Sequence, residues 1–290
     1  MRVFYTIVAL TTILASCTGG SASPTDNSET AVFKNDDIEI HQIDEHTWHG
    51  HGHRVYNESV YIVEGDSVAL MIDAGYTIPG LRKIAEDIVK KPTIFVATHV
   101  HRDHTGKAVN EWDSVWICEP DTINIARDMS GYKGKIFFLN DGQTFDLGNR
   151  LIEVVFTPGH TPGSVTFIDK EAHYGFSGDS FGSTSLLVTT SLSEVIRTCN
   201  LMSKYMEQYG IDKLYPGHNP GDNLETLQRV NDLAEISAGI LNGDYKPKTS
   251  HWQRAIEIVT SIFDKSTVYV VPNTVEDRGL RISYGKRQLK

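Results

Sequence analysis

The 290-residue sequence lacks clustered positive charge. It has 27 Lys and Arg against 37 Asp and Glu, a formal net charge of −10, and no run of five or more basic residues. Phosphate backbones are bound by clustered Lys and Arg, so this composition argues against a nucleic-acid partner. Hydrophobic residues make up 40% of the chain, which is enough to bury one large core.

The apolar stretch at the N-terminus is too short to cross a bilayer. Val3 to Leu14 is 12 residues long and follows Arg2, whereas a spanning helix needs about 20 residues. These features are typical of a signal peptide. The next residues, Leu-Ala-Ser-Cys ending at Cys17, resemble a bacterial lipobox, which implies cleavage before Cys17 and lipidation of its thiol. The alternative is an ordinary secretory signal with an incidental cysteine.

This interpretation divides the chain into three parts. Residues 1–16 are the lipoprotein signal peptide, residues 17–36 are the lipidated cysteine with a flexible polar tether, and residues 37–290 are the folded domain. Several acyl chains on one cysteine give stable anchoring. We therefore expect a protein held by lipid in the bacterial cell envelope, on the periplasmic face of a membrane or in the outer membrane.

Cysteine is scarce, with only three in the chain. If Cys17 carries lipid, Cys118 and Cys199 remain. Cys118 follows an apolar, strand-like run, and Cys199 lies on the apolar stripe of a predicted helix. Both are predicted to be buried core thiols rather than partners in a disulfide.

Strands and helices alternate in the first half. Apolar runs predict strands at Ile38–Ile43, Tyr56–Glu64, Val68–Ile72 and Thr93–Thr98. A helix opening at Pro79 separates the last two, because apolar residues recur there with helical spacing. This order predicts a layered α/β domain.

The second half is predicted to be a strand meander followed by helices. The expected strands are 136–139, 151–156, 164–168 and 174–176. Ser191 and Asp222 are expected to cap amphipathic helices. A last helix is predicted at Trp252–Phe263, and closing strands at Thr267–Val271 and Leu280–Ser283.

Three imidazoles and one carboxylate emerge where the strand ending at Thr98 stops. His99 and His101 are two residues apart, so on extended backbone their side chains point the same way. Asp103 and His104 follow where the chain must turn. Their side chains can therefore face a second position, next to the one that His99 and His101 face. The spacing suits two adjacent metal ions.

This His-x-His-x-Asp-His stretch resembles the signature of the metallo-β-lactamase superfamily. Three later motifs of that family occur in the expected order: Pro-Gly-His ending at His160, Gly-Asp ending at Asp179, and a late Pro-Gly-His ending at His218. The motif similarity covers roughly residues 38–220. It implies a four-layer αββα sandwich. Asp73, in an Asp-x-Gly turn, corresponds to an Asp that is structural in this family.

The resemblance also implies a ligand set and a chemistry. His99, His101 and His160 would hold one metal ion and Asp103, His104 and His218 a second, with Asp179 bridging them. Two Zn²⁺ ions are expected, with iron or manganese as alternatives, and a bridging hydroxide as the nucleophile. Asp103 has a mixed ligand and catalytic role. The implied function is hydrolysis of an ester, thioester, lactone or amide carbonyl in a small molecule.

Three alternatives remain open at this point. A persulfide dioxygenase with a single iron shares much of the motif, and a metal-binding lipoprotein without activity would keep the same ligands. Gly178-Asp-Ser-Phe-Gly182 matches the nucleophile elbow of serine hydrolases, with Ser180 as nucleophile and Asp212 and His218 following in the right order. That elbow requires a helix starting at the Ser, but the next clear helix begins only near Ser191.

A second group of histidines, at positions 46, 49, 51 and 53, alternates with Gly and other residues. We interpret it as a flexible loop that borders the mouth of the active site; a substrate contact from His51 or His53 and adventitious metal binding are the alternatives.

Overall fold

The computed structural model describes residues 31–290 apart from 54–56, 220, 222, 252 and 254–270. Ala31–Lys290 forms one compact unit. Its first half is an eight-stranded sheet whose strands follow chain order. They are β1 (Phe33–Lys34), β2 (Ile38–Asp44), β3 (Thr47–Gly52), β4 (Ser59–Glu64), β5 (Ala69–Ile72), β6 (Thr93–Val96), β7 (Ser114–Ile117) and β8 (Lys135–Phe138).

The direction of pairing changes at β5. Strands β1 to β5 are antiparallel neighbours, whereas β5 to β8 are parallel. Parallel neighbours need crossover connections, and these contain α1 (Leu81–Val89), the short turns η1 (Lys107–Glu111) and η2 (Glu119–Asp121), and α2 (Thr122–Asp128). The segments that follow β5, β6 and β7 therefore emerge at one edge of the sheet.

The second half contains a five-stranded and a four-stranded sheet. The five-stranded sheet, in the order β14-β12-β11-β10-β9, is built from β9 (Thr144–Asp146), β10 (Leu151–Phe156), β11 (Val165–Asp169), β12 (Tyr174–Gly178) and β14 (Lys213–Pro216). The smaller sheet is built from β13 (Ser185–Leu187), β15 (Lys248–Thr249), β16 (Asn273–Asp277) and β17 (Leu280–Tyr284). Helices α3 (Leu192–Tyr209) and α4 (Leu227–Asn242) and the turn η3 (Lys286–Gln288) complete this half.

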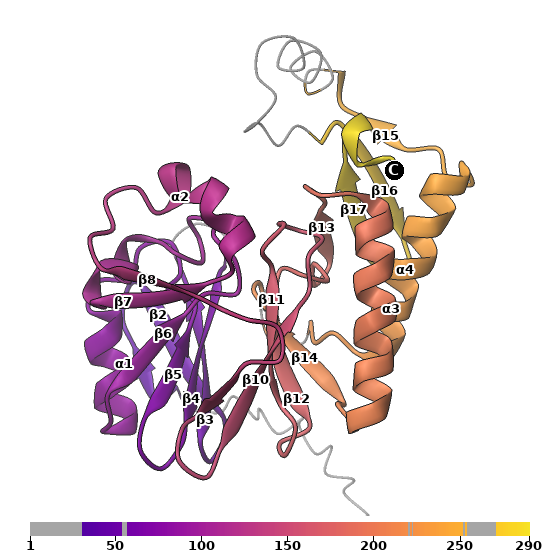
Figure 1. Ribbon diagram of the computed structural model, residues 1–290. Coiled ribbons are helices and arrows are strands. Elements are labelled where there is room, and N and C mark those ends of the chain that lie inside the picture. Colours follow the sequence, from indigo (N-terminus) through magenta and orange to yellow (C-terminus); the bar gives the residue numbers. More distant parts are fainter. Residues whose placement is uncertain (1–30, 54–56, 220, 222, 252, 254–270) are drawn as a thin grey trace, which may run out of the picture. The chain divides into compact units, whose positions relative to one another are not determined.

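The layers are helix, sheet, sheet, helix, with α1 on the outside of the first sheet and α3 and α4 on the outside of the second half (Figure 1). Three clusters of buried apolar side chains fill the spaces between these layers. One lies between α1 and the first sheet, one joins the two large sheets around residues such as Tyr61 and Phe176, and one lies beneath α3 and α4. The predicted αββα sandwich is confirmed.

Several local predictions are also confirmed. Pro79 precedes α1, whose Leu81, Ala85 and Val89 are buried. Ser191 caps α3, because its side chain accepts a hydrogen bond from the Glu194 N–H. Cys118 and Cys199 are buried and unpaired.

Other local predictions were wrong. The histidine-rich segment is not a loop but strand β3, which pairs with β2 and β4 on its two sides. Strand β8 does not belong to the second-half meander, since it pairs in parallel with β7 in the first sheet. Helix α4 is capped by Thr226, which accepts from the Arg229 N–H, four residues beyond the predicted cap. Asp222, the predicted helix 252–263 except residue 253, and residues 267–270 lie outside the described residues.

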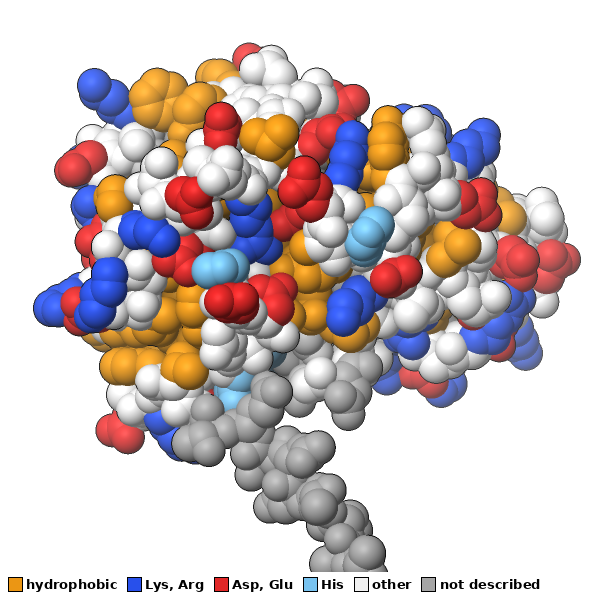
Figure 2. Space-filling model, turned by 90° about the horizontal axis from the view of Figure 1, so that it is seen from below, with side chains coloured by type: hydrophobic (Ala, Val, Ile, Leu, Met, Phe, Trp, Pro, Cys, Tyr) orange, Lys and Arg blue, Asp and Glu red, His pale blue; other side chains and the backbone are white. Residues whose placement is uncertain are grey.

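The surface carries both signs of charge. Figure 2 shows acidic, basic and hydrophobic side chains interspersed over one face of the protein. Among the described helices, none has both the length and the apolar character that crossing a lipid bilayer requires.

Candidate metal centre

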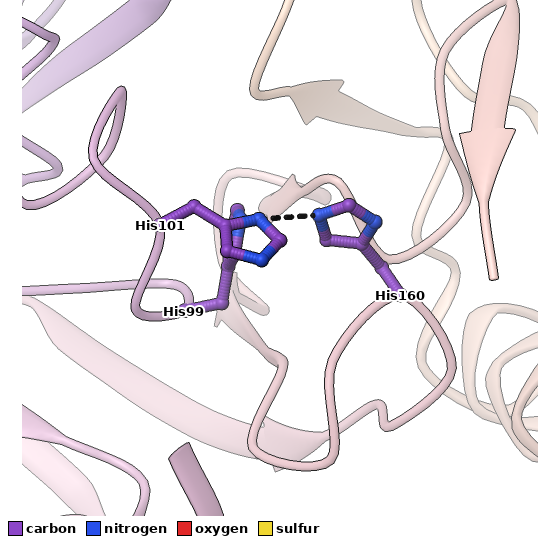
Figure 3. Close-up of side chains that lie close together, drawn as sticks. All are labelled: His99, His101 and His160. Carbon is purple, nitrogen blue, oxygen red and sulfur yellow. Dashed lines mark hydrogen bonds between the residues drawn. The ribbon is translucent and has the colours of Figure 1, made fainter. Parts of the chain in front are cut away.

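Three imidazoles converge where β6 and β10 end. His99 Nε2 and His160 Nε2 each lie 3.0 Å from His101 Nδ1, and Figure 3 shows the His101 and His160 rings turned toward each other. Burial first and neighbouring imidazoles second lower the pKa of His101 to about 3 and that of His99 well below its usual value. The His99 and His101 rings are therefore neutral near pH 7, and ring nitrogen atoms of all three histidines lie close enough together to hold one cation.

Hydrogen bonds behind the rings select the tautomer that can bind a cation. His160 Nδ1 is 2.8 Å from the Leu187 carbonyl oxygen, which can only accept, so Nδ1 carries the proton and Nε2 keeps its lone pair. His99 Nδ1 is 3.2 Å from Thr98 Oγ1, whose own proton is donated to Asp73 Oδ2 at 2.8 Å. His99 therefore also presents an unprotonated Nε2.

A second group of ligands adjoins the first. Asp103 Oδ2 lies 3.4 Å from His218 Nε2 and 3.9 Å from His104 Nε2. His104 Nδ1 donates to Asp73 Oδ2 at 2.8 Å. Asp73 also accepts from the backbone and hydroxyl of Thr98 and is almost fully buried. It therefore supports the ligands from behind, in the structural role expected for it.

The Asp179 carboxylate lies between the two groups. Its Oδ2 is 3.5 Å from His160 Nε2 and 3.3 Å from His218 Nε2, and its Oδ1 is 3.5 Å from His104 Nε2. The parallel pairing of β12 with β14 explains this position, because it brings the segments after both strands to the same edge. The Asp179 carboxylate thus faces both groups of predicted ligands, as a ligand shared by two metal ions would.

The charges of the site are strongly coupled. Burial opposes ionisation of Asp179, but the imidazoles of His218 and His104 outweigh it and hold the pKa of Asp179 well below its usual range. Conversely, burial lowers the pKa of His104, but the carboxylates of Asp73, Asp179 and Asp103 raise it to about 9. The pKa of His218 is raised well above its usual value, chiefly by Asp179 against the opposing effect of burial.

The donor set fits divalent cations. All seven predicted ligands fall into three overlapping groups, within each of which the ligand atoms lie within 4.8 Å of one another. Imidazole and carboxylate are the ligands that zinc takes in catalytic sites. His104 Nε2 is moreover buried without a hydrogen-bond partner among the described residues, which is costly unless a cation occupies that direction. The binding of metal by these residues stays a prediction.

Close approach at the site requires glycine at position 217. A Cβ there would lie 2.3 Å from Asp179 Oδ1 and 2.6 Å from His104 Cε1, far inside contact distance. The Pro-Gly-His turn thus lets His218 approach while leaving room for the Asp179 carboxylate.

Sequence reasoning missed Asp121, which ties the two halves of the site together. This fully buried side chain accepts from the Val100 N–H at 2.7 Å, the Thr161 hydroxyl at 2.9 Å and the Gly163 N–H at 2.8 Å. It therefore holds the loop of the first motif against the loop of His160. No local pattern marks it, since its partners lie 21 to 42 residues away.

Glu225 is a second buried support that the sequence did not indicate. It accepts from the Ser177 hydroxyl at 2.5 Å and the Ser183 N–H at 2.8 Å, and the Ser183 hydroxyl donates to the carbonyl of His218 at 2.9 Å. Burial raises the pKa of Glu225 to about 7. The segments carrying Asp179 and His218 are thereby linked.

The geometry does not favour a serine nucleophile. Ser180 is buried, its Oγ lies 2.8 Å from Thr157 Oγ1, and β13 intervenes before the next helix, α3. The strand-to-helix elbow is therefore missing from this described segment. His218, the base of that alternative, lies instead beside Asp103 and Asp179.

The β3 histidines lie beside the loop of His218. His49 Nε2 is 2.9 Å from Ser59 Oγ, which accepts from the Asn219 N–H at 3.0 Å. His53 is exposed. A substrate contact from His51 or His53 stays a prediction, and Cys17 lies outside the described residues.

The chain is thus an α/β protein with an αββα sandwich, and two adjoining groups of His and Asp side chains at its sheet edges could hold metal ions. Residues 53–218, more than half of the chain, match the family model described as Metallo-beta-lactamase superfamily. The chain belongs to this superfamily.

Its relatives include named hydrolases. The chain is 26% identical over 224 residues to acyl-coenzyme A thioesterase MBLAC2 of Homo sapiens, a match that covers 63% of this chain and 80% of the relative. It is 23% identical over 211 residues to a probable polyketide biosynthesis zinc-dependent hydrolase, BaeB, of Bacillus velezensis, covering 68% and 88%. Among solved structures, a metallo-beta-lactamase from Pontibacter korlensis superposes with a TM-score of 0.56 at 20% identity, covering 69% of this chain and 99% of that one.

Proposed function

We propose that this protein is a binuclear zinc hydrolase that cleaves a carbonyl bond in a small molecule, with a thioester as the first substrate class to test. The observation that carries the proposal is the position of Asp179, whose Oδ2 lies near both His160 and His218 and whose Oδ1 lies near His104. The names of two relatives, a thioesterase and a zinc-dependent hydrolase, support the choice of reaction and metal.

The metal ions and the residues that orient their ligands would have different roles in the reaction. Two bound zinc ions would supply an activated water and polarise the substrate carbonyl. The chain itself holds the donors in fixed rotamers, through Asp73 behind His104 and the Leu187 carbonyl behind His160. Such supporting bonds raise the basicity of the ligands and fix their orientation.

Asp103 is proposed to receive a proton during the reaction. Burial raises its pKa, but His104 and His218 outweigh this and lower the pKa to about 2, so the carboxylate is ionised near pH 7. Its side chain is 16% exposed, more than that of His104. It can therefore accept a hydrogen bond from a water molecule in the cleft and orient it.

The test combines metal analysis with turnover. The purified protein and its Asp179→Ala variant are analysed for metal per chain and assayed on a series of thioesters, esters, lactones and amides. We expect about two zinc ions in the parent, at least one lost in the variant, and hydrolysis that chelation abolishes. Asp36→Ala is the matched control, because it removes an exposed carboxylate that belongs to neither candidate site.

Other results would favour the alternatives. One iron ion per chain, retained in the Asp179→Ala variant, would favour the persulfide dioxygenase. Two zinc ions without turnover on any carbonyl substrate would favour a non-catalytic metal-binding protein, and activity that survives chelation but requires Ser180 would favour serine chemistry.

We also propose that Cys17 anchors the protein to a bacterial envelope membrane. The apolar run that precedes Leu-Ala-Ser-Cys supports this proposal. Metabolic labelling with a fatty acid should mark the parent and not a Cys17→Ser variant, which should fractionate with soluble proteins. An unlabelled parent would contradict the anchor and leave the hydrolase proposal intact.

A further inference from the structure

A positively charged pocket adjoins the loop that carries four of the metal ligands. Its volume is about 220 Å³, and it is lined by three segments: the turn after β5, the metal loop with η1, and the end of α2. Its charged lining consists of Arg102, Lys107, Arg127 and Asp128. None of these residues has a place in the metal centre.

The pocket carries an excess of positive charge. Arg102 Nε lies 3.5 Å from Asp128 Oδ1 and Arg127 Nε lies 2.9 Å from Asp128 Oδ2, so two guanidinium groups share one carboxylate. Lys107 forms no ion pair with any residue in the described part of the chain. Three cations and one carboxylate leave a local charge of +2 in a protein of net charge −10.

Both arginines can still reach a ligand. The Arg102 side chain is 50% exposed and the Arg127 side chain 34% exposed, whereas Asp128 is only 3% exposed. Both guanidinium groups line the pocket, and the buried Asp128 carboxylate pairs with both of them, while Arg127 Nη2 also donates to Asn124 Oδ1 at 3.3 Å. Guanidinium groups held in this way suit the bidentate recognition of anionic oxygens.

The pocket shares a loop with the candidate metal site. Arg102 lies between His101 and Asp103 in the chain, and Thr105 and Gly106, directly after His104, also line the pocket. An anionic group bound here would be held beside the metal loop, where it could position the rest of the molecule.

We propose that this pocket binds a phosphate group in the carrier portion of the substrate, such as a phosphate of a coenzyme A thioester. This inference rests on the proposed thioester hydrolysis. A dianionic phosphate matches the local charge of +2. Binding energy from a remote group of this kind raises the specificity for the carrier without a new contact at the reacting carbonyl.

The affinity of the pocket for a phosphate-bearing ligand can be measured without any reaction. The probe is desulfo-coenzyme A, which lacks the thiol that would bind zinc, and binding is measured by calorimetry on the full-length, zinc-loaded protein. We expect Lys107→Glu to weaken binding at least tenfold, and high salt to reduce the difference. Lys204→Glu, an exposed position on α3, is the control with the same change of charge.

Related probes identify the phosphate. Loss of affinity with desulfo-3′-dephospho-coenzyme A would assign the pocket to the 3′-phosphate, whereas retained, Lys107-dependent affinity would assign it to the diphosphate. Either result supports the proposal. Binding that Lys107→Glu and Lys204→Glu weaken equally, or no binding at millimolar concentration, would overturn it.

Hydrolysis rates on thioesters with and without a phosphate distinguish this inference from the proposed function. The acyl-coenzyme A thioester is compared with the same acyl group on N-acetylcysteamine, which has no phosphate. We expect Lys107→Glu to raise KM for the first at least tenfold and to leave kcat/KM for the second unchanged. Equal losses on both thioesters would overturn the inference. If neither is hydrolysed but desulfo-coenzyme A binding depends on Lys107, thioester hydrolysis is contradicted, whereas phosphate binding in the pocket is retained.

Discussion

Asp121 Oδ2 accepts a hydrogen bond from the Val100 N–H at 2.7 Å, although the two residues belong to different loops. Val100 lies between two predicted ligands, His99 and His101. The same oxygen accepts from the Thr161 hydroxyl, next to His160. A single buried carboxylate therefore sets the distance between the loop that carries His99 and His101 and the loop that carries His160.

Removing this carboxylate should affect both stability and metal binding. We expect Asp121→Ala to lower the free energy of unfolding by about 2–4 kcal/mol, because three donors lose their acceptor in the interior. Zinc affinity should fall about 10–100-fold. Denaturant unfolding and a zinc competition titration measure the two effects. Glu119→Ala, an exposed carboxylate in the same turn, should change neither; a similar loss there would refute the role of Asp121.

Gly217→Ala should disrupt the bridging position. The new Cβ would lie 2.3 Å from Asp179 Oδ1, so either the carboxylate or the loop must move. We expect at least one metal ion to be lost and kcat to fall about 100-fold or more, measured by metal analysis and steady-state kinetics. Gly243→Ala is the control for strain alone: its Cβ meets nothing within 4 Å, but its φ of +83° disfavours alanine, so it should lower stability and leave the metal content unchanged. A fully loaded, active Gly217→Ala protein would contradict the observed packing.

Zinc binding should release protons. In the metal-free protein the carboxylates raise the pKa of His104 to about 9 and that of His218 well above its usual value, so both rings are protonated at pH 7. Zinc requires unprotonated nitrogen, so binding displaces these protons, and affinity should rise as the pH increases toward about 9. Calorimetry in buffers of different ionisation enthalpy should report about two protons released. Binding independent of pH between 6 and 9 would refute this.

Acid should destabilise the protein through His49. Burial first, and then the imidazoles of His51 and His41, lower its pKa to about 3 from 6.5. Between these values the unfolded chain binds a proton that the folded chain does not, so the free energy of unfolding falls as the pH decreases from about 6.5 toward 3.

The size of this effect is measurable by substitution. Relative to His49→Gln, the parent should lose roughly 2 kcal/mol more between pH 6.5 and 4.5, in denaturant unfolding at each pH. His53→Gln, at an exposed position, should keep the slope of the parent. Identical slopes for the parent and His49→Gln would show that His49 titrates normally in the folded state.

The sequence predicted the parts of the site that depend on local order. The spacing of the first motif and the alternation of strands and helices can be read along the chain. His160, Asp179 and His218 and the four layers were predicted from the family resemblance instead. The N-cap of α3 is likewise a local signal, since Ser191 and Glu194 are three residues apart.

The errors concern features that depend on long-range contacts. His and Gly are weak strand formers, but pairing with β2 and β4 on both sides makes residues 47–52 a strand. The parallel pairing of β8 with β7 needs a crossover whose length the apolar pattern does not reveal. Asp121 and Glu225 resemble ordinary surface acids until folding buries them.

The seven predicted ligands come from both sheets. His99 to His104 follow β6 of the first sheet, whereas His160, Asp179 and His218 follow strands of the second. Neither half carries a complete set for two ions, so a fragment cut between β8 and β9 would have to reassociate before it could retain both. Metal retention therefore reports that the two halves have come together, and proteolysis with and without chelator would reveal when they separate.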